Sequence, residues 1–347
     1  MSGVVTGWTG RFGAGLVALV ALAASPASAQ ERLTVLCGVQ EEWCKAIAVA
    51  FEKKSGIPVA MSRKSAGEAL AQLRAEAANP KTDVWWGGPG DPHLQAAEEG
   101  LTQPQDSQYA KDLQPWALSQ HRQSKGRSVG IYAGALGFVY NVEMLAKRKI
   151  EPPKCWADLL RPEFKDEVQI ANPNASGTAY TALATLVQIF GEDGAFEYLK
   201  KLNDNVNQYT KSGSAPASAV SRGETLVGVI FTHDGINQKV NGFPVDVSTP
   251  CEGTGYEIGS VSIIKGTRKL DAAKAFYEFA LSPEGQATGA QAKQFQVPSN
   301  KKAPTPPEAP NFEDIRFIDY NFQKYGTAEE RKRLLSRWDS EIKSAGK

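Results

Sequence analysis

The sequence is poor in the residues from which metal centres and nucleophilic active sites are built. Its 347 residues include three histidines and four cysteines, with no Cys-x-x-Cys pair. A Gly-x-Ser-x-Gly elbow, a complete Gly-x-Gly-x-x-Gly pattern and a Walker lysine are also missing. Ser176, His233 and Asp234 are the right types for a triad, but an adjacent His and Asp cannot easily orient one another. We therefore predict that the protein is not an enzyme and that it carries neither a metal nor a cofactor.

Neither sign of charge is in excess. The 39 basic and 38 acidic residues leave a net charge of +1. Lysines and arginines are scattered among carboxylates along the whole chain. A nucleic-acid-binding surface needs positive charge that is clustered on one face. The composition therefore predicts that nucleic acid is not a partner.

The one apolar run near the start of the chain is too short to span a membrane. This run, at residues 12–24, follows Arg11 and precedes Ala27-Ser28-Ala29. A positive charge, a short hydrophobic core and an A-x-A site form the pattern of a secretory signal peptide. We expect residues 1–29 to be removed by cleavage after Ala29. No cysteine follows that site to carry a lipid anchor, so the mature chain is expected to be free in the periplasm.

All four cysteines lie in the part of the chain that would be exported. An even number of cysteines in an oxidising compartment favours disulfides, and four cysteines allow three pairings. We favour Cys37 with Cys44, which would join the end of a first strand to the following helix. That choice leaves Cys155 with Cys251. Four buried free thiols are the alternative.

Short apolar runs alternate with helical periodicity along the mature chain. Strands are expected at residues 33–36, 57–61 and 83–86. Three βα units in a row predict a parallel sheet with crossover helices, and a second αβ layer follows between residues 135 and 250. The expected fold class is α/β, with two αβ lobes. The expected boundaries are residues 30–133 plus 251–303 for the first lobe and 134–250 plus 304–347 for the second.

The stretch Asn172–Thr181 leads from a short strand into a helix through small and hydroxyl-bearing residues. Backbone N–H groups at such a helix start lack intrahelical partners and lie at the positive end of the helix dipole, beside the Ser176 and Thr178 hydroxyls. An anion such as phosphate or phosphonate fits there. An ordinary N-cap is the alternative. Residues 212–214 form a second hydroxyl-rich turn of the same kind.

Loops that follow parallel strands meet at one edge of the sheet, where ligands bind. Ser65 and the Gly87–Gly90 loop are expected at that edge. His233 and Asp234 follow a buried strand and are suited to binding sugar hydroxyls or an amine. The candidate ligand-binding residues are Ser65, Gly67, Gly88, Ser176, Gly177, Thr178, Gly213, Ser214, His233, Asp234 and Glu257.

Some neighbouring residues are expected to play lesser roles. Of the two acidic residues in the turn at residues 251–259, we prefer Glu257 to Glu252 as the ligand group. We expect His93 at the surface, because its surroundings are polar. One of Trp85 and Trp86 is expected to belong only to the core, while the other could line the pocket.

Taken together, these residues carry a resemblance to a known family. The chain resembles bacterial periplasmic solute-binding proteins of ABC importers, in the extracellular type 2 group of ferric-ion, hexose-phosphate and aminoethylphosphonate binders. This resemblance implies two αβ lobes joined by a hinge, with the ligand in the cleft between them, and a monomer that delivers its ligand to an ABC permease in the inner membrane. The stretches that carry the resemblance are Asp83–Gly88, Pro152–Leu159, Asn172–Tyr180, Ser212–Ser214 and Glu252–Glu257.

The resemblance also implies a ligand class. Ferric binders of this group commonly use two adjacent tyrosines, and this sequence has no Tyr-Tyr pair. We therefore expect a small anionic solute, a phosphorylated sugar or organophosphonate, captured by hinge closure. Ferric ion, or presentation of a ligand to a chemoreceptor or sensor kinase, is the alternative. In the resemblance, the phosphoryl group is held by Ser65, Ser176, Gly177, Thr178, Gly213 and Ser214, and hydroxyls or an amine by His233, Asp234 and Glu257.

Overall fold

The computed structural model describes residues 1–10 and 32–342. Residues 1–10 form neither helix nor strand. Most of the expected signal peptide, including its cleavage site after Ala29, lies outside the described residues. Within the described ranges, no helix combines the length and the apolar character needed to cross a membrane.

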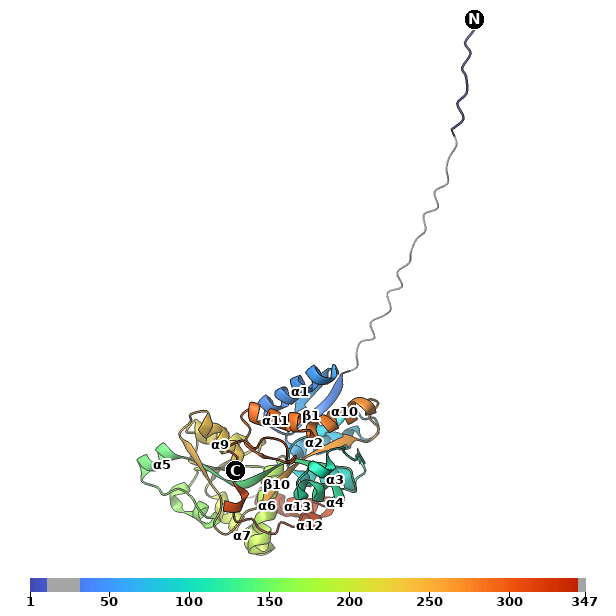
Figure 1. The fold of residues 1–347 in the computed structure, drawn as a ribbon. Coiled ribbons are helices and arrows are strands. Elements are labelled where there is room, and N and C mark those ends of the chain that lie inside the picture. Colours follow the sequence, from blue (N-terminus) through green and yellow to red (C-terminus); the bar gives the residue numbers. More distant parts are fainter. Residues whose placement is uncertain (11–31, 343–347) are drawn as a thin grey trace. The chain divides into compact units, whose positions relative to one another are not determined.

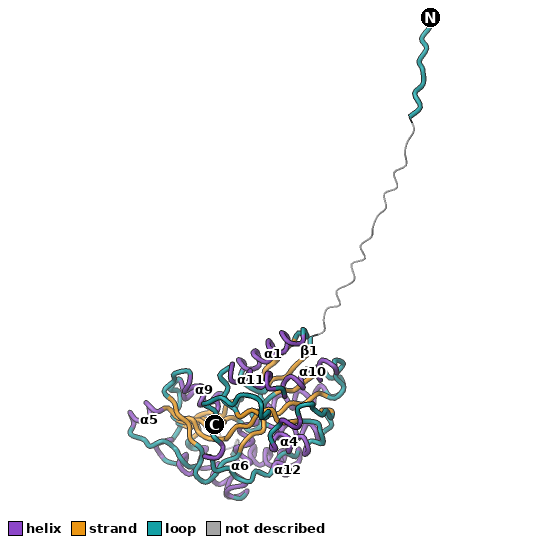
Figure 2. Tube along the Cα trace, in the orientation of Figure 1, coloured by secondary structure: helices purple, strands orange, loops and turns teal. Residues whose placement is uncertain are grey.

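Strands lie in the interior of residues 32–342 and helices lie around them (Figure 2). The strands are β1 (Leu33–Cys37), β2 (Val59–Arg63), β3 (Val84–Trp86), β4 (Thr102–Gln103), β5 (Val129–Asn141), β6 (Val168–Ala171), β7 (Val206–Thr210), β8 (Val227–Phe231), β9 (Val245–Ser248), β10 (Tyr256–Ile264) and β11 (Val297–Pro298). The α-helices are α1 (Glu41–Ser55), α2 (Ala66–Glu76), α3 (Gly90–Glu98), α4 (Pro115–Gln123), α5 (Val142–Arg148), α6 (Gly177–Phe190), α7 (Glu192–Asn203), α8 (Ala215–Ser221), α9 (Thr232–Val240), α10 (Leu270–Leu281), α11 (Pro283–Gln291), α12 (Phe322–Tyr325) and α13 (Ala328–Glu341). Short 3-10 helices are η1 (Ala110–Asp112), η2 (Trp156–Leu160), η3 (Pro162–Phe164) and η4 (Phe312–Asp314).

The strands form one mixed sheet in the order β2-β1-β3-β10-β5-β8-β6-β7. Strands β1, β2 and β3 are parallel to one another, as the sequence predicts, and β6, β7 and β8 form a second parallel group. Between the two groups lie β5 and β10, which pair antiparallel. We call the β1–β3 side lobe 1 and the β6–β8 side lobe 2. The α/β fold with two αβ lobes is thus confirmed.

The direction of the strands explains where a ligand site can form. Strand β3 is antiparallel to β10, and β10 is antiparallel to β5, so β3 runs in the same direction as β5. Because β5 runs from lobe 1 into lobe 2, the parallel strands of lobe 1 run toward lobe 2. Strand β8 is antiparallel to β5, so lobe 2 strands run back toward lobe 1. The carboxyl ends of both parallel groups therefore point at each other. In an open α/β sheet, that edge is where ligands bind.

The change from one lobe to the other occurs within β5. Up to Ala135 this strand pairs with β10, and from Leu136 onward it pairs with β8. The expected lobe boundary at residues 133/134 lies close to this change of partners. The detailed residue boundaries of the two lobes stay a prediction.

The helices pack as their apolar spacing predicts. Trp43, Ile47 and Phe51 recur every four residues and give α1 one buried face, and Gly56 ends the helix in the left-handed conformation. Helices α1, α10 and α11 pack together beside β1 (Figure 1). Helix α6 of lobe 2 is largely apolar and is buried from Gly177 to Val187. A helix of that composition belongs inside a core.

Two disulfides are present, with the pairing that the sequence favours. Cys37 at the end of β1 is joined to Cys44 in α1. Cys155, just before η2, is joined to Cys251, ahead of β10. No free cysteine remains among the described residues.

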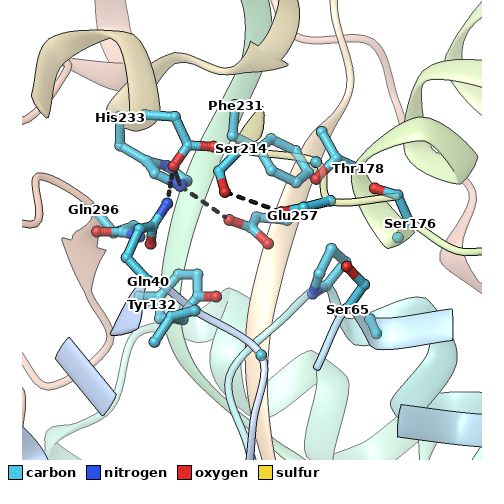
Figure 3. A pocket seen from close by; sticks show the side chains of 18 of the residues that line it. Gln40, Ser65, Tyr132, Ser176, Thr178, Ser214, Phe231, His233, Glu257 and Gln296 are labelled. Atoms are coloured by element: carbon cyan, nitrogen blue, oxygen red, sulfur yellow. Dashed lines mark hydrogen bonds and ion pairs between the residues drawn. The ribbon is translucent and has the colours of Figure 1, made fainter. Parts of the chain in front are cut away.

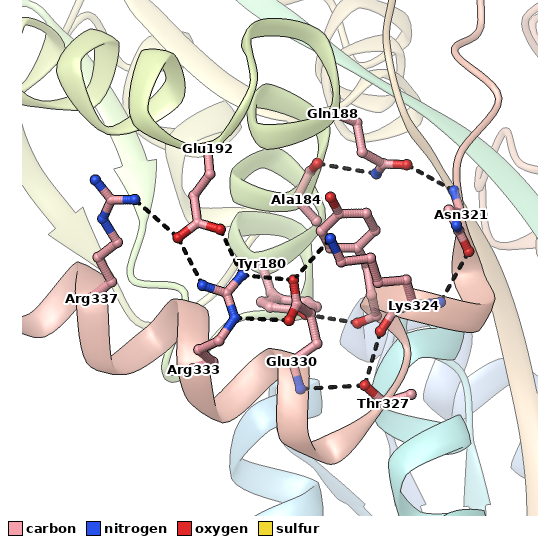
Figure 4. A network of polar contacts seen from close by, with 11 residues as sticks. Tyr180, Ala184, Gln188, Glu192, Asn321, Lys324, Thr327, Glu330, Arg333 and Arg337 are labelled. Carbon is pink, nitrogen blue, oxygen red and sulfur yellow. Dashed lines mark hydrogen bonds and ion pairs between the residues drawn. The ribbon is translucent and has the colours of Figure 1, made fainter.

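The carboxyl-terminal segment is fastened to α6 and α7 by a network of polar contacts (Figure 4). The Tyr180 hydroxyl donates to the Tyr325 carbonyl oxygen at 2.7 Å. Glu192, at the start of α7, accepts hydrogen bonds from Arg333 and Arg337 of α13 at 2.7–2.9 Å. These two guanidinium groups lower the pKa of Glu192 to about 2. The network ties α13 to lobe 2.

Candidate ligand-binding site

Residues from both lobes line a small cleft at the facing carboxyl edges (Figure 3). The residues that line it are Gly38, Val39, Gln40, Arg63, Ser65, Ala66, Pro89, Tyr132, Ser176, Gly177, Thr178, Ser212, Gly213, Ser214, Phe231, His233, Asp234, Glu257 and Gln296.

The structure brings most of the predicted site residues together in this cleft. They are Ser65, Ser176, Gly177, Thr178, Gly213, Ser214, His233, Asp234 and Glu257. Gly67 and Gly88 do not line it. The ligand-binding role of the residues in the cleft stays a prediction.

Gly67 and Gly88 make backbone hydrogen bonds within the protein next to the cleft. The Gly67 N–H donates to the carbonyl oxygen of Ala175 in lobe 2 at 3.1 Å. A Cβ on Gly67 would lie 2.6 Å from the carbonyl oxygen of Asn174, so only glycine allows the lobes to approach this closely. The Gly88 N–H donates to the Tyr132 hydroxyl oxygen at 3.0 Å, and it is Tyr132 that lines the cleft.

One end of the cleft is suited to an anion. Ser176 caps α6, its Oγ accepting from the Ala179 N–H at 3.4 Å, and it lines the cleft as well. The ordinary N-cap is therefore present, and the start of α6 still faces the cleft with its free N–H groups and positive dipole. The hydroxyl oxygens of Ser212 and Ser214, 3.1 Å apart, lie in the facing turn of the same lobe. Thr178 adds a fourth hydroxyl.

Sequence analysis missed Arg63, the one lysine or arginine among the residues that line the cleft. It ends β2, and its Nη2 donates across the cleft to the Oγ atoms of Ser212 and Ser214 at 3.2 and 3.3 Å. Its Nε donates to the Val39 carbonyl oxygen at 2.7 Å. An oriented guanidinium is well suited to phosphate oxygens. The signal was available, because Arg63 stands two residues after the expected strand at residues 57–61.

The other end of the cleft is acidic and buried. His233 and Asp234 begin α9, and Glu257 lies on β10. The His233 Nε2 is 3.8 Å from Asp234 Oδ1 and 3.7 Å from Glu257 Oε1. Gln40 of lobe 1 donates a side-chain hydrogen bond across the cleft to Asp234 Oδ1. All three titratable side chains are at most 5% exposed.

Burial sets the protonation of these groups. It lowers the pKa of His233 to about 3, so the imidazole is neutral at pH 7 and makes no ion pair with the carboxylates. Burial raises the pKa of Asp234 to about 7, against the charge of Arg63 and the hydrogen bond from Gln40. Burial, together with the nearby charges of Asp234 and Asp91, holds the pKa of Glu257 well above its usual range. This end therefore offers hydrogen-bonding groups of little net charge.

Two residues that line the cleft carry buried polar atoms without a protein partner. Within the described part of the chain, the His233 Nδ1 and both side-chain polar atoms of Gln296 make no hydrogen bond. Gln296, which sequence analysis also missed, is 4% exposed. Buried polar groups in native proteins are nearly always satisfied. These unpaired atoms set His233 and Gln296 apart from the other side chains that line the cleft.

Two other expectations are corrected by the structure. His93 is fully buried rather than at the surface, and its ring stacks on Trp85 at a centroid distance of 3.7 Å. Both Trp85 and Trp86 belong to the core, and neither lines the cleft. The preference for Glu257 agrees with its position in the cleft. Glu252 instead accepts from the Trp156 and Ala157 N–H groups at the start of η2.

Two αβ lobes, linked by long crossing strands around a cleft lined with hydrogen-bonding groups, define a type 2 periplasmic binding protein. Solved structures share this arrangement over almost their whole length. The periplasmic binding protein AfuA from Actinobacillus pleuropneumoniae, solved with exogenous fructose-6-phosphate bound, has a TM-score of 0.86 and 44% identity, covering 90% of this chain and 98% of that one. The periplasmic binding protein P5PA has the same TM-score of 0.86 with 38% identity, covering 90% and 99%.

The chain belongs to the bacterial extracellular solute-binding protein family, which it matches over residues 90–324. An uncharacterized protein of Haemophilus influenzae is 45% identical over 322 residues, which are 92% of this chain and 93% of that protein. At 26% identity, the relatives include an Fe(3+)-binding periplasmic protein of Serratia marcescens (77% and 79% covered) and a putative 2-aminoethylphosphonate-binding periplasmic protein of Salmonella paratyphi A (78% and 80%). Proteins of this kind bind small solutes outside the cytoplasmic membrane and serve ABC importers.

Proposed function

We propose that this protein is the periplasmic receptor of an ABC importer for a phosphorylated sugar. The observation that carries the proposal is the division of the cleft into two unlike ends. Arg63, the Ser212 and Ser214 hydroxyls and the start of α6 converge at one end. His233, Asp234, Glu257, Gln40 and Gln296 gather at the other. A phosphate ester of a polyol has one group suited to each end.

Each end would contribute differently to binding. At the anion end, the guanidinium, the hydroxyls and the helix dipole would receive phosphate oxygens through charge-assisted hydrogen bonds. At the acidic end, carboxyl oxygens and a neutral imidazole both accept and donate, as hydroxyl groups require. Fructose-6-phosphate in the related AfuA supports this assignment.

Ligand capture would occur through closure of the lobes. Contacts that cross the cleft already join Ser65 Oγ to the Lys211 carbonyl oxygen at 3.0 Å and Arg63 to the two serines. A ligand that touches both lobes adds to these contacts only in the closed form, and its differential affinity shifts the equilibrium toward closure. The closed form would then deliver the ligand to the permease.

Ferric ion is the competing cargo, and the cleft supports it less. Tyr132 is the one tyrosine that lines the cleft, and its hydroxyl oxygen accepts a hydrogen bond from the Gly88 N–H. Among the described residues, the one group of three closely spaced metal-type ligands is Cys155, Cys251 and Glu252. Both of its cysteines are used in a disulfide.

A thermal-shift comparison separates these cargoes. The purified mature protein is heated with fructose 6-phosphate, fructose, inorganic phosphate, 2-aminoethylphosphonate or ferric citrate. We expect the largest rise in Tm with the sugar phosphate and none with fructose, because at a given concentration a tighter ligand stabilises the folded form more. A rise with ferric citrate and none with any phosphorus compound would overturn the proposal. Amino-terminal sequencing of the exported protein, with Gln30 as the expected first residue, tests the location.

A further inference from the structure

We infer that the Cys37–Cys44 disulfide is a positioning element of the ligand site, which acts by holding the backbone that orients Arg63. The inference rests on the proposed function in one respect, namely that Arg63 receives the anionic group of the ligand. The disulfide itself does not touch the cleft. Its effect passes through the segment Gly38–Gln40 that it encloses.

The disulfide closes a small ring at the edge of the cleft. The cysteines are separated by seven positions in the sequence, and both side chains are at most 3% exposed. Cys37 ends β1 and Cys44 lies in the first turn of α1, so the ring fixes the passage from strand to helix. The three residues Gly38, Val39 and Gln40 between strand and helix all line the cleft. The ring therefore forms part of the wall of the site.

The enclosed segment holds the cation of the site directly. The Val39 carbonyl oxygen accepts from Arg63 Nε at 2.7 Å, which leaves Nη2 directed at Ser212 and Ser214 across the cleft. The Arg63 side chain is exposed, so little packing would restrict its long stem without this bond. Both Val39 and Arg63 belong to lobe 1, and the bond can persist when the lobes separate. Arg63 would thus be oriented before a ligand arrives, which lowers the entropic cost of binding.

The cross-link also keeps the carbonyl itself in place. Gly38 packs under the β3–α3 turn, where an added Cβ would lie 2.4 Å from the Gly87 carbonyl oxygen, and its N–H donates to the Trp86 carbonyl oxygen at 2.9 Å. On the other side, Cys44 Sγ lies 3.6 Å from the Val39 carbonyl oxygen. Opening the ring would free the segment between these two anchors. The Val39 carbonyl would then no longer have one fixed direction.

The second disulfide supplies a matched control. Cys155 and Cys251 join η2 to the segment ahead of β10, and neither residue lines the cleft. Removing it would disturb stability without changing the groups around Arg63. The two disulfides thus separate an effect on binding from an effect on folding.

The test is calorimetric titration of fructose 6-phosphate into three proteins: wild type, Cys37→Ala/Cys44→Ala and Cys155→Ala/Cys251→Ala. We expect Kd to rise about tenfold in the first variant, in line with the coupling between residues that share a network, and less than about twofold in the second. Equal affinity in wild type and the Cys37→Ala/Cys44→Ala variant overturns the inference. So does an equal loss in both variants, which would indicate a general effect on folding.

A double-mutant cycle asks whether the effect passes through Arg63. In an Arg63→Gln background, opening the same ring is expected to change Kd less than about twofold, because the group that it orients is gone. Full additivity would overturn the inference. If Arg63→Gln alone leaves Kd unchanged, the proposed function fails; if Arg63→Gln weakens binding and the open ring does not, only the present inference fails.

Should the Cys37→Ala/Cys44→Ala variant not fold, Val39→Gly with the disulfide intact answers the same question. The glycine gives the carbonyl more conformational freedom and leaves the ring closed. If Val39→Gly raises Kd in the wild-type protein but not in the Arg63→Gln protein, the positioning role is supported. An unchanged Kd overturns it.

Discussion

The N–H of Gly67 in lobe 1 donates a hydrogen bond of 3.1 Å to the carbonyl oxygen of Ala175 in lobe 2. The backbone of one lobe therefore touches the backbone of the other, immediately ahead of the turn that begins α6. A Cβ at Gly67 would lie 2.6 Å from the Asn174 carbonyl oxygen and 2.7 Å from the Ala175 carbonyl oxygen. The contact can form only while residue 67 has no side chain. Closure of the cleft thus depends on a residue that does not line it.

Replacing Gly67 by Ala is expected to hold the lobes apart. The added methyl group meets backbone atoms that cannot move aside as a side chain can, so the closed form loses stability. We expect ligand affinity to fall about tenfold or more, since every 1.4 kcal/mol of closure energy is a factor of ten. Titration calorimetry measures the affinity, and small-angle scattering of the liganded protein measures closure. Gly194→Ala in α7, where an added Cβ finds Phe190 Cβ at 3.4 Å and nothing closer, is the control and should bind normally.

Arg63→Gln is expected to weaken binding of a phosphorylated ligand by about 10- to 100-fold, the usual contribution of a hydrogen bond to a charged group. Lys64→Gln removes the same charge one residue further along, from a side chain that does not line the cleft. It is expected to leave the affinity within about twofold. Equal losses in the two variants, measured by calorimetry, would mean that long-range charge rather than a directed contact attracts the ligand.

The buried Asp234 predicts a dependence of stability on pH. Its pKa is about 7 in the folded protein against an ordinary value of 3.8, so the folded state binds the proton more tightly between these values. The stability contributed by the protonated form is therefore lost as the pH rises from 3.8 to about 7. His233 acts in the opposite sense. Its pKa falls from 6.5 to about 3, so stability is lost as the pH falls below 6.5.

Asp234→Asn removes the first effect and leaves the second. The free energy of unfolding of the variant, relative to that of wild type, should increase as the pH is raised from 4 to 8. The increase should be at most about 4 kcal/mol. Urea unfolding at the two pH values measures the difference. The same difference between variant and wild type at both pH values would contradict a raised pKa of Asp234.

The two disulfides should differ in what they contribute to stability. The Cys155–Cys251 bond closes a loop with a sequence separation of 96, against 7 for Cys37–Cys44. Chain entropy predicts that losing the longer loop costs about 4–5 kcal/mol and losing the shorter one about 2–3 kcal/mol. Urea unfolding of the two alanine double variants checks the order. A larger loss from the shorter loop would show that local packing, not chain entropy, sets these values.

Much of the architecture could be predicted because it rests on local patterns. Apolar periodicity gave α1 its buried face through Trp43, Ile47 and Phe51, and the βα units fixed the parallel group of lobe 1. Hydroxyl-rich turns identified Ser176 and Ser214, since helix starts leave a signature in sequence. The pairing of the cysteines followed from their positions relative to expected strands.

The residues that sequence analysis missed depend on distant parts of the chain. Arg63 enters the site because β2 ends opposite Ser212, and Gln296 because the chain returns to β5 through β11. His93 appeared to be polar surface and is buried, because Trp85 and Ser262 supply a ring and a hydroxyl partner from neighbouring strands. Gly67 is predicted to bind the ligand, whereas in the structure its lack of a side chain allows the two lobes to approach each other. Such pairings are set by tertiary packing, which single-sequence patterns do not contain.

The most direct test of the central claim compares two ligands that differ only in the phosphate. Fructose 6-phosphate and fructose are titrated calorimetrically into the wild type and into Arg63→Gln. We predict tight binding of the phosphate ester by the wild type, weaker binding by Arg63→Gln, and no detectable binding of fructose by either protein. Equal affinity for fructose and fructose 6-phosphate, or equal affinity of both proteins for the ester, would contradict an anion site built around Arg63 and the start of α6.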